Sequence, residues 1–148
     1  MRGKIIVNDH ERAAKELLET ATTIASVGLS SNPDKESYGI VFYLKAQGYK
    51  IIPVNPNADE IMGERSYPRL SDIPDKVDIV QIFRSSEVVP PIVDEAIKIG
   101  AKAVWMQEGI VNEEAGQTAS EAGLFVVMDI CMRAAHQWFG IGPKPIKL

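Results

Sequence analysis

The chain has 148 residues, of which 45% are hydrophobic and 24% are charged, and its formal net charge is -4. This length fits one domain with a single core, and no apolar run reaches the roughly 20 residues that a membrane-spanning helix needs. The acidic balance with scattered basic residues argues against nucleic-acid binding, and one cysteine with two distant histidines argues against a disulfide framework and a metal site. The N-terminus lacks the apolar core and cleavage site of a secretory signal, which predicts a cytoplasmic protein.

Short apolar runs alternate along the chain with segments of helical pattern. A first helix is expected over residues 8–20, with Asp9 as its N-cap, as an accessory packed on the domain. Apolar runs predict strands over residues 23–29, 49–57, 77–83, 101–107 and 124–130. Helices are expected over residues 38–46, 85–100 and 111–123, a short helical turn over residues 131–140, and a C-terminal tail over residues 136–148.

Local signals set the ends of these elements. Ser85 or Ser86 is expected to cap the helix over residues 85–100, whose two prolines must lie in its first turn. Asn112 is expected to cap the next helix. The polar segment 57–74 is a long excursion that contains one short strand around residues 64–67.

The expected strands are nearly continuous apolar runs, which is typical of a parallel sheet covered by helices on both faces. The sequence therefore predicts one α/β domain over residues 1–148, with a doubly wound, mostly parallel sheet in a Rossmann-like three-layer α/β/α arrangement. Ligands of such sheets bind at the carboxyl ends of the strands, at the switch point beside the first strand. The segments at that edge are residues 28–32, 54–57, 83–85, 106–109 and 129–131.

The turn after the first strand has the outline of an anion site. Gly28 lets the backbone turn sharply, and Ser30, Ser31 and Asn32 offer donors at the N-terminal end of the next helix. A plain turn with its normal capping residues fits the same pattern. The other segments at this edge must separate the two interpretations.

The second strand ends without the acidic residue that holds the ribose in a nicotinamide dehydrogenase. Asn55 and Pro56 stand there instead, and suit an apolar wall for an adenine ring with a side-chain hydrogen bond. Arg84 follows the third strand and fits either a bidentate phosphate contact or a surface ion pair, and Lys35 is a second phosphate candidate. Gln107 is expected at the same edge, as a ligand contact or a turn residue.

Five blocks, taken in order, carry a resemblance to a known family. They read VGLSSNPDKESYG, GYKIIPVNP, VDIVQIFRSSEVVPPIVDEAI, AVWMQEGI and AGLFVVMDIC, and extend from about Ile24 to Cys131. Together they resemble the small bacterial and archaeal coenzyme A-binding proteins with a Rossmann-like fold, and the N-terminal domain of the succinyl-CoA synthetase α subunit and of ADP-forming acyl-CoA synthetases. The resemblance implies CoA as the ligand, held by residues of the matching blocks: Gly28, Ser30, Ser31, Asn32, Asn55, Pro56, Phe83, Arg84, Met106 and Gln107. The predicted site also includes Leu29, Lys35 and Cys131.

The chain also departs from the synthetases. Their second domain carries a histidine that becomes phosphorylated, and neither His10 nor His136 matches that motif. We therefore expect the CoA module without ligase chemistry. The resemblance also accounts for the missing ribose carboxylate, because the ribose of CoA carries a 3′-phosphate that a carboxylate would repel.

Several roles stay open at this point. A protein that binds CoA or an acyl-CoA can be a carrier, a store or a sensor, and a mixed disulfide of Cys131 with CoA would make it redox-responsive. An enzyme acting on an acyl-CoA thioester through Glu108 or Asp129 is one alternative. Another is an adenine-nucleotide-sensing module whose exposed tail, Trp138 to Leu148, docks a protein partner. A homo-oligomer stays open as well.

Overall fold

The sheet of the protein is built from the apolar runs that the sequence marks as strands. The structure, a computed structural model, describes residues 5–6 and 11–145. Five parallel strands lie side by side, joined at one edge by a short antiparallel strand: β1 (Ile5–Ile6), β2 (Thr23–Val27), β3 (Lys50–Val54), β6 (Ile79–Ile82), β7 (Ala103–Met106) and β8 (Phe125–Met128). Their order in the sheet is β1-β8-β7-β6-β2-β3. The predicted doubly wound, mostly parallel α/β fold is confirmed.

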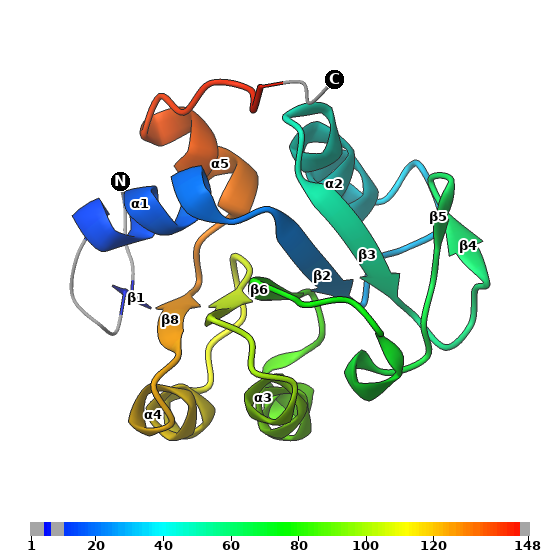
Figure 1. Cartoon of the computed structure of the whole chain (residues 1–148). Coiled ribbons are helices and arrows are strands. Elements are labelled where there is room, and N and C mark those ends of the chain that lie inside the picture. The colour runs from blue at the N-terminus through cyan, green and yellow to red at the C-terminus, as the bar shows by residue number, and fades with distance from the viewer. Residues whose placement is uncertain (1–4, 7–10, 146–148) are drawn as a thin grey trace.

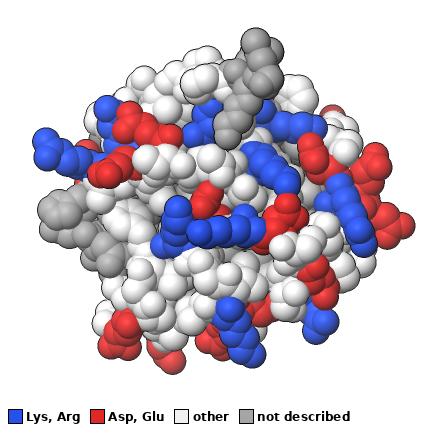
Figure 2. All heavy atoms as spheres, in the orientation of Figure 1, with Lys and Arg blue, Asp and Glu red and all other residues white. Residues whose placement is uncertain are grey.

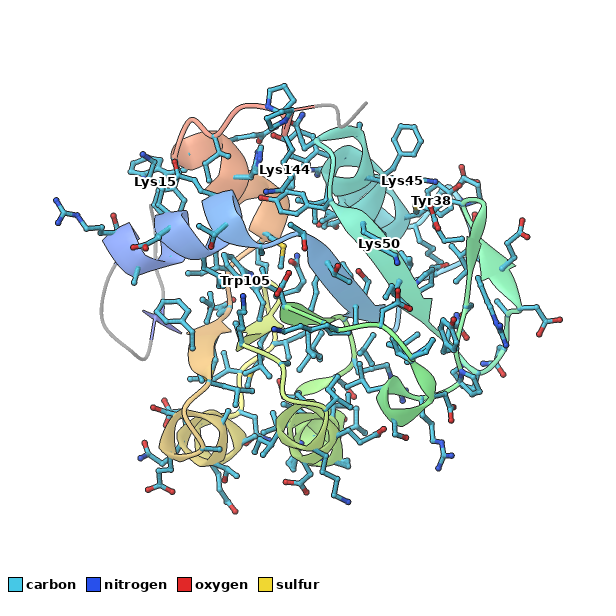
Figure 3. The ribbon with its side chains drawn as sticks, in the orientation of Figure 1. Lys15, Tyr38, Lys45, Lys50, Trp105 and Lys144 are labelled. Carbon is cyan, nitrogen blue, oxygen red and sulfur yellow. The ribbon has the colours of Figure 1, made fainter. Side chains whose placement is uncertain are left out.

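Helices cover both faces of this sheet (Figure 1). In the view shown, α1 (Glu11–Thr20), α2 (Glu36–Ala46) and α5 (Met132–Trp138) lie above it, and α3 (Val89–Lys98) and α4 (Glu113–Glu121) lie below it. Side chains along each strand alternate between the two layers because successive Cβ atoms point to opposite faces. Trp105 is 1% exposed and lies in the core layer that includes α1, α2 and α5 (Figure 3).

The structure corrects the expected helix ends. The first described residue of α1 is Glu11, and the proposed cap Asp9 lies outside the described residues. The serine cap of α3 is wrong: a 3₁₀ turn, η2 (Ser86–Val88), precedes that helix, and the side chain of Ser85 makes no capping bond. The Ser86 hydroxyl accepts from the Val111 N–H at 3.0 Å instead. The Asn112 cap of α4 is confirmed, since its side chain accepts from the Ala115 N–H.

The polar excursion between β3 and β6 forms a hairpin and a short 3₁₀ turn. The predicted short strand is β5 (Glu64–Arg65), which pairs with β4 (Glu60–Ile61), and η1 (Leu70–Asp72) follows. Lys45 of α2 holds the hairpin: its Nζ donates to the Met62 carbonyl at 2.7 Å and lies 3.1 Å from the Glu64 carboxylate. This hairpin borders the carboxyl end of β3.

The C-terminal segment does not extend from the domain as the expected tail would. His136 is 1% exposed, and its Nδ1 lies 2.8 Å from the Tyr43 hydroxyl. The Lys144 N–H donates to the Gln47 carbonyl at 2.8 Å, and its Nζ lies 4.6 Å from the centre of the Tyr49 ring. Residues after α5 therefore pack back onto α2, and the prediction of an exposed tail is wrong for Phe139 and Ile141, which pack against the core.

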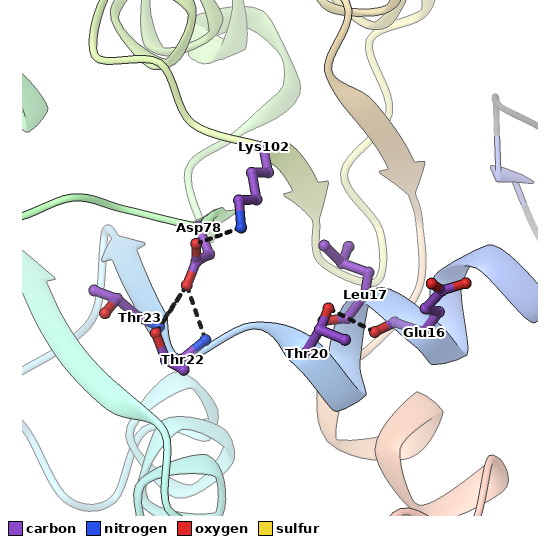
Figure 4. Close-up of polar contacts among 7 residues, drawn as sticks. All are labelled: Glu16, Leu17, Thr20, Thr22, Thr23, Asp78 and Lys102. Carbon is purple, nitrogen blue, oxygen red and sulfur yellow. Dashed lines mark hydrogen bonds and ion pairs between the residues drawn. The ribbon is translucent and has the colours of Figure 1, made fainter.

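Asp78 ties three strands together at the amino-terminal edge of the sheet (Figure 4). Its Oδ2 accepts from the Thr22 N–H at 2.8 Å, the Thr22 hydroxyl at 3.0 Å and the Thr23 N–H at 3.1 Å, and Lys102 lies 3.4 Å from Oδ1. Burial alone would raise the pKa of Asp78, but these hydrogen bonds outweigh it and lower the pKa. The carboxylate thus stays ionised and holds this edge of the sheet closed.

Candidate functional site

The candidate site lies at the opposite, carboxyl edge, where the strand order changes direction. The chain passes from β2 to β3 on one side and then crosses to β6 on the other. At this switch point the Gly28 N–H donates to the Val54 carbonyl at 3.0 Å, and the Phe83 N–H donates to the Val27 carbonyl at 2.9 Å. The turn over residues 28–32 is therefore anchored to both neighbouring strands, in the place where doubly wound sheets bind ligands.

Gly28 and Arg84 are in direct contact. Gly28 has a φ of +86°, and a Cβ added to it would lie 2.9 Å from Cδ and 3.1 Å from Cγ of Arg84. Glycine is required here twice, for the left-handed backbone and for the close passage of the arginine stem. The Arg84 residue is exposed, so its guanidinium is carried across the turn toward solvent.

The polar side chains of the turn hold the turn itself. The Ser30 N–H donates to the Ser37 hydroxyl at 3.1 Å, the Asn32 N–H to the Ser30 hydroxyl at 3.0 Å, and the Asp34 N–H to Oδ1 of Asn32 at 2.9 Å. The N–H groups of Ser30 and Asn32 therefore donate within the turn, although the sequence predicted them as donors to an anion. The N–H groups of Leu29 and Ser31 take part in none of these hydrogen bonds.

Asn55 is a brace between β3 and the turn. Its Nδ2 donates to the Leu29 carbonyl at 2.9 Å, and its Oδ1 accepts from the Asn57 N–H at 2.8 Å. The adjacent Pro56 is exposed. Pro56 is thus exposed where the sequence predicts a wall for an adenine ring, and the Asn55 amide is engaged in positioning the turn.

A buried row of polar side chains runs beneath the site. The Ser26 hydroxyl donates to Oε1 of Gln81 at 2.8 Å, and Nε2 of Gln81 donates to Oε1 of Gln107 at 3.0 Å. The same Gln107 oxygen accepts from the Met132 N–H at 2.9 Å. Gln107 is 4% exposed, so it is a buried link between β6, β7 and the start of α5. The sequence analysis missed Ser26 and Gln81, although two polar residues inside apolar strands were the available signal.

The other predicted site residues divide by exposure. Leu29 and Met106 are fully buried, so their side chains belong to the core and they can reach a ligand only through their backbone. Phe83 and Cys131 are half-buried, and Ser31, Asn32 and Lys35 are exposed. The structure therefore joins the ends of β2, β3 and β6 closely around the turn, and joins β7 to α5 through Gln107.

The two carboxylates considered for catalysis differ. Asp129 has a φ of +61°, and its Oδ1 accepts from the Gly109 N–H at 2.6 Å, which fixes the turn after β7. Glu108 is exposed. Cys131 is the residue before the first turn of α5, and it is a free thiol.

Arg133 of α5 lies near the beginning of α2, and it was not predicted from the sequence as a site residue. Its Nη1 lies 3.8 Å from where a Cβ on Gly39 would stand, in the first turn of α2. Nothing in the local sequence signals this proximity, because residues 39 and 133 meet only when α2 and α5 pack on the same face of the sheet.

On the face seen in Figure 2, lysines and arginines are interspersed with acidic residues and do not form one basic surface. At the amino-terminal edge a groove is lined partly by Thr20, Lys50 and Lys144 (Figure 3). Lys50 is paired there with Asp75, and Nζ of Lys144 donates to the Glu19 carbonyl at 3.0 Å. Its cations are thus engaged within the protein.

Among the described residues, no three metal-ligating side chains lie close enough together to hold an ion. No helix in that part of the chain is long and apolar enough to cross a membrane.

Two similar proteins match this chain over most of its length. The "Uncharacterized protein YneT" of Bacillus subtilis is 41% identical over 129 residues, which is 87% of this chain and 96% of that protein. A "hypothetical protein from Pyrococcus horikoshii OT3" superposes with a TM-score of 0.87 at 36% identity, covering 94% of this chain and 99% of that one. Both relatives have nearly the length of this chain.

Larger enzymes contain a similar domain. The Archaeoglobus fulgidus protein "Acetate--CoA ligase [ADP-forming] II" is 39% identical over 94 residues, 62% of this chain but only 14% of the ligase. The apo "dinucleotide forming Acetyl-coenzyme A synthetase 1" of Ca. Korarchaeum cryptofilum superposes with a TM-score of 0.66 at 34% identity, covering 75% of this chain and 26% of that one. Residues 22–137, which include every strand around the switch point, match the family described as "CoA binding domain", and the chain belongs to this family.

Proposed function

We propose that this protein binds CoA or an acyl-CoA at the carboxyl edge of its sheet, as a cytoplasmic carrier, store or sensor without ligase chemistry of its own. The observation that carries the proposal is the turn over residues 28–32, anchored at the switch point with Arg84 laid across Gly28. An arginine at the turn that leads into α2 favours a phosphorylated ligand. Membership of the CoA-binding family supports CoA as that ligand.

The order of the strands suggests how the ligand lies. The adenine end packs near Pro56 at the end of β3, and the pyrophosphate lies at the turn after β2. The pantetheine arm then crosses the ends of β6 and β7 toward β8 and α5. Three strand spacings separate β2 from β8, about 14 Å, which an extended pantetheine arm covers. The thiol or thioester end therefore lies near Cys131.

Titration calorimetry tests the ligand, with CoA, acetyl-CoA, NAD and ATP as probes. We expect CoA or acetyl-CoA to bind more tightly than NAD or ATP. Arg84→Gln should weaken CoA binding by about tenfold or more, since a charge-assisted hydrogen bond contributes about 1.5–3 kcal/mol. Arg12→Gln, on the exposed side of α1, is the control with the same change in charge. Tighter binding of NAD than of CoA would overturn the proposal.

Cys131 gives the site a second chemistry. We propose that its thiolate attacks CoA disulfide, forming a Cys131–CoA mixed disulfide and releasing one molecule of CoA thiolate. The half-buried position of the thiol at the start of α5 supports this, because it lies at the end of the proposed pantetheine path. Intact mass after incubation with CoA disulfide should rise by one CoA, return on reduction, and stay unchanged in Cys131→Ser. An unchanged mass of the wild-type protein after incubation with CoA disulfide would contradict the mixed disulfide.

A thioesterase-like or other enzymatic role has less support. Asp129 is already bonded to the Gly109 N–H and holds an unusual backbone conformation, which suits a turn-forming role. Turnover of an acyl-CoA that disappears in Glu108→Gln would favour the enzyme over the carrier. Size-exclusion chromatography with light scattering, with and without CoA, tests the homo-oligomer.

A further inference from the structure

Arg133 carries its guanidinium from α5 to the beginning of α2. Its Nη1 lies 3.8 Å from the Cβ position of Gly39, in the first turn of that helix. In the same turn, the Ser37 hydroxyl accepts from the Ser30 N–H and so joins the helix to the turn after β2. The guanidinium therefore lies beside the helix end into which that turn leads.

Among the described residues, no ion pair accounts for this position. Ion pairs among residues 5–6 and 11–145 involve Lys15, Lys45, Lys50, Arg69 and Lys102, and none involves Arg133. The Arg133 residue is half-buried. Burial raises the pKa of Tyr43, and the Arg133 guanidinium offsets part of that rise, which fits a cation whose field is felt along the α2–α5 contact.

The site already has positive charge on its other side. Arg84 crosses Gly28 from the end of β6, and α2 presents the N-terminal, positive end of an 11-residue helix. Glu36 is the acidic group in the first turn of α2, and it is exposed. Arg84 and Arg133, from distant parts of the chain, thus lie against two segments that the Ser30–Ser37 hydrogen bond joins: the turn after β2 and the first turn of α2.

We propose that Arg133 binds the pyrophosphate of the ligand, opposite Arg84. The assignment rests on the proposed function, because it places the charged centre of CoA at the turn over residues 28–32. A guanidinium presents parallel N–H donors that match phosphate oxygens, and it stays charged at every physiological pH. Because Arg133 is two residues after Cys131 in the sequence, a bound pyrophosphate also fixes the start of α5, where the thiol stands.

A series of shortened ligands tests this assignment. CoA carries the pyrophosphate and the 3′-phosphate, dephospho-CoA carries the pyrophosphate alone, and pantetheine carries neither. Calorimetry gives the affinities of the first two, and chemical-shift changes at millimolar concentration give that of pantetheine. We expect Arg133→Gln to weaken the binding of CoA and of dephospho-CoA by the same factor, about tenfold, and to leave the binding of pantetheine unchanged. Arg133→Lys should retain part of the affinity, and Arg12→Gln should retain all of it.

Three outcomes overturn the assignment. Unchanged CoA affinity in Arg133→Gln would show that the guanidinium does not touch the ligand. If Arg133→Gln loses affinity for CoA but not for dephospho-CoA, Arg133 contacts the 3′-phosphate. If it loses as much affinity for pantetheine as for CoA, Arg133 is a structural residue of α5. If thermal unfolding shows that Arg133→Gln does not fold, Arg133→Lys carries the same comparison, with a several-fold loss expected for both nucleotides. If the wild type does not bind CoA at all, that different result contradicts the proposed function itself.

Discussion

Replacing Gly28 by alanine tests the contact on which the site depends. The backbone at Gly28 has a φ of +86°, and an added Cβ would lie 2.9 Å from Cδ of Arg84. A left-handed conformation costs a non-glycine residue about 1–2 kcal/mol. Pushing the flexible arginine stem off its rotamer adds about 0.5–1.5 kcal/mol. We therefore expect Gly28→Ala to lose about 1.5–3.5 kcal/mol of unfolding free energy in urea, and to lose CoA affinity because Arg84 is displaced.

Gly123→Ala is the matched control, because Gly123 has a φ of +93° and nothing lies within 4 Å of its added Cβ. It should lose the backbone contribution of about 1–2 kcal/mol and none of the CoA affinity. The double variant Gly28→Ala, Arg84→Ala should recover the part of the stability that the clash removes. Equal losses of stability and unchanged CoA affinity in Gly28→Ala and Gly123→Ala would refute the reasoning.

Three further predictions concern buried polar groups. Burial lowers the pKa of His136 below 6.5, and nearby Lys144 lowers it further, so the contribution of the neutral imidazole to stability is present above pH 6.5 and is lost as the pH falls through the folded pKa. The urea midpoint should therefore fall less in His136→Gln than in the wild type between about pH 7.5 and pH 5. An identical fall in the two proteins would contradict this. The pKa of Asp78 is lowered from 3.8, so its contribution to the stability of the fold is present above pH 3.8 and is lost as the pH falls through the folded pKa. Asp78→Asn should lower the free energy of unfolding in urea at neutral pH by about 1.5–3 kcal/mol. A loss below the error of the fit would show that the carboxylate is dispensable. Gln107→Leu leaves two buried N–H donors without an acceptor, at Gln81 and Met132, and should lower the free energy of unfolding by about 1–3 kcal/mol per donor. Gln107→Glu keeps an acceptor oxygen and should unfold at a higher urea concentration than Gln107→Leu.

The fold could be predicted from local patterns, and the reason is physical. Strands buried on both faces must be apolar throughout, and β2, β6 and β7 are legible as such from the sequence alone. The edge strand β1 was missed because a strand of two residues has no pattern to detect. The serine cap of α3 failed because two serines offered the same local signal, while a 3₁₀ turn and the Val111 N–H decided the outcome.

For the site, the sequence by itself determined which segments stand at the carboxyl edge, since parallel strands with helical crossovers bring all their ends to one side. The resemblance carried by its five blocks also identified the family. Only the tertiary structure decided what each side chain does there: that Gly28 makes room for Arg84, that Gln107 is buried, and that Arg133 reaches α2. Such roles depend on packing between residues far apart in the chain, and local sequence patterns carry no information on which distant side chains will meet.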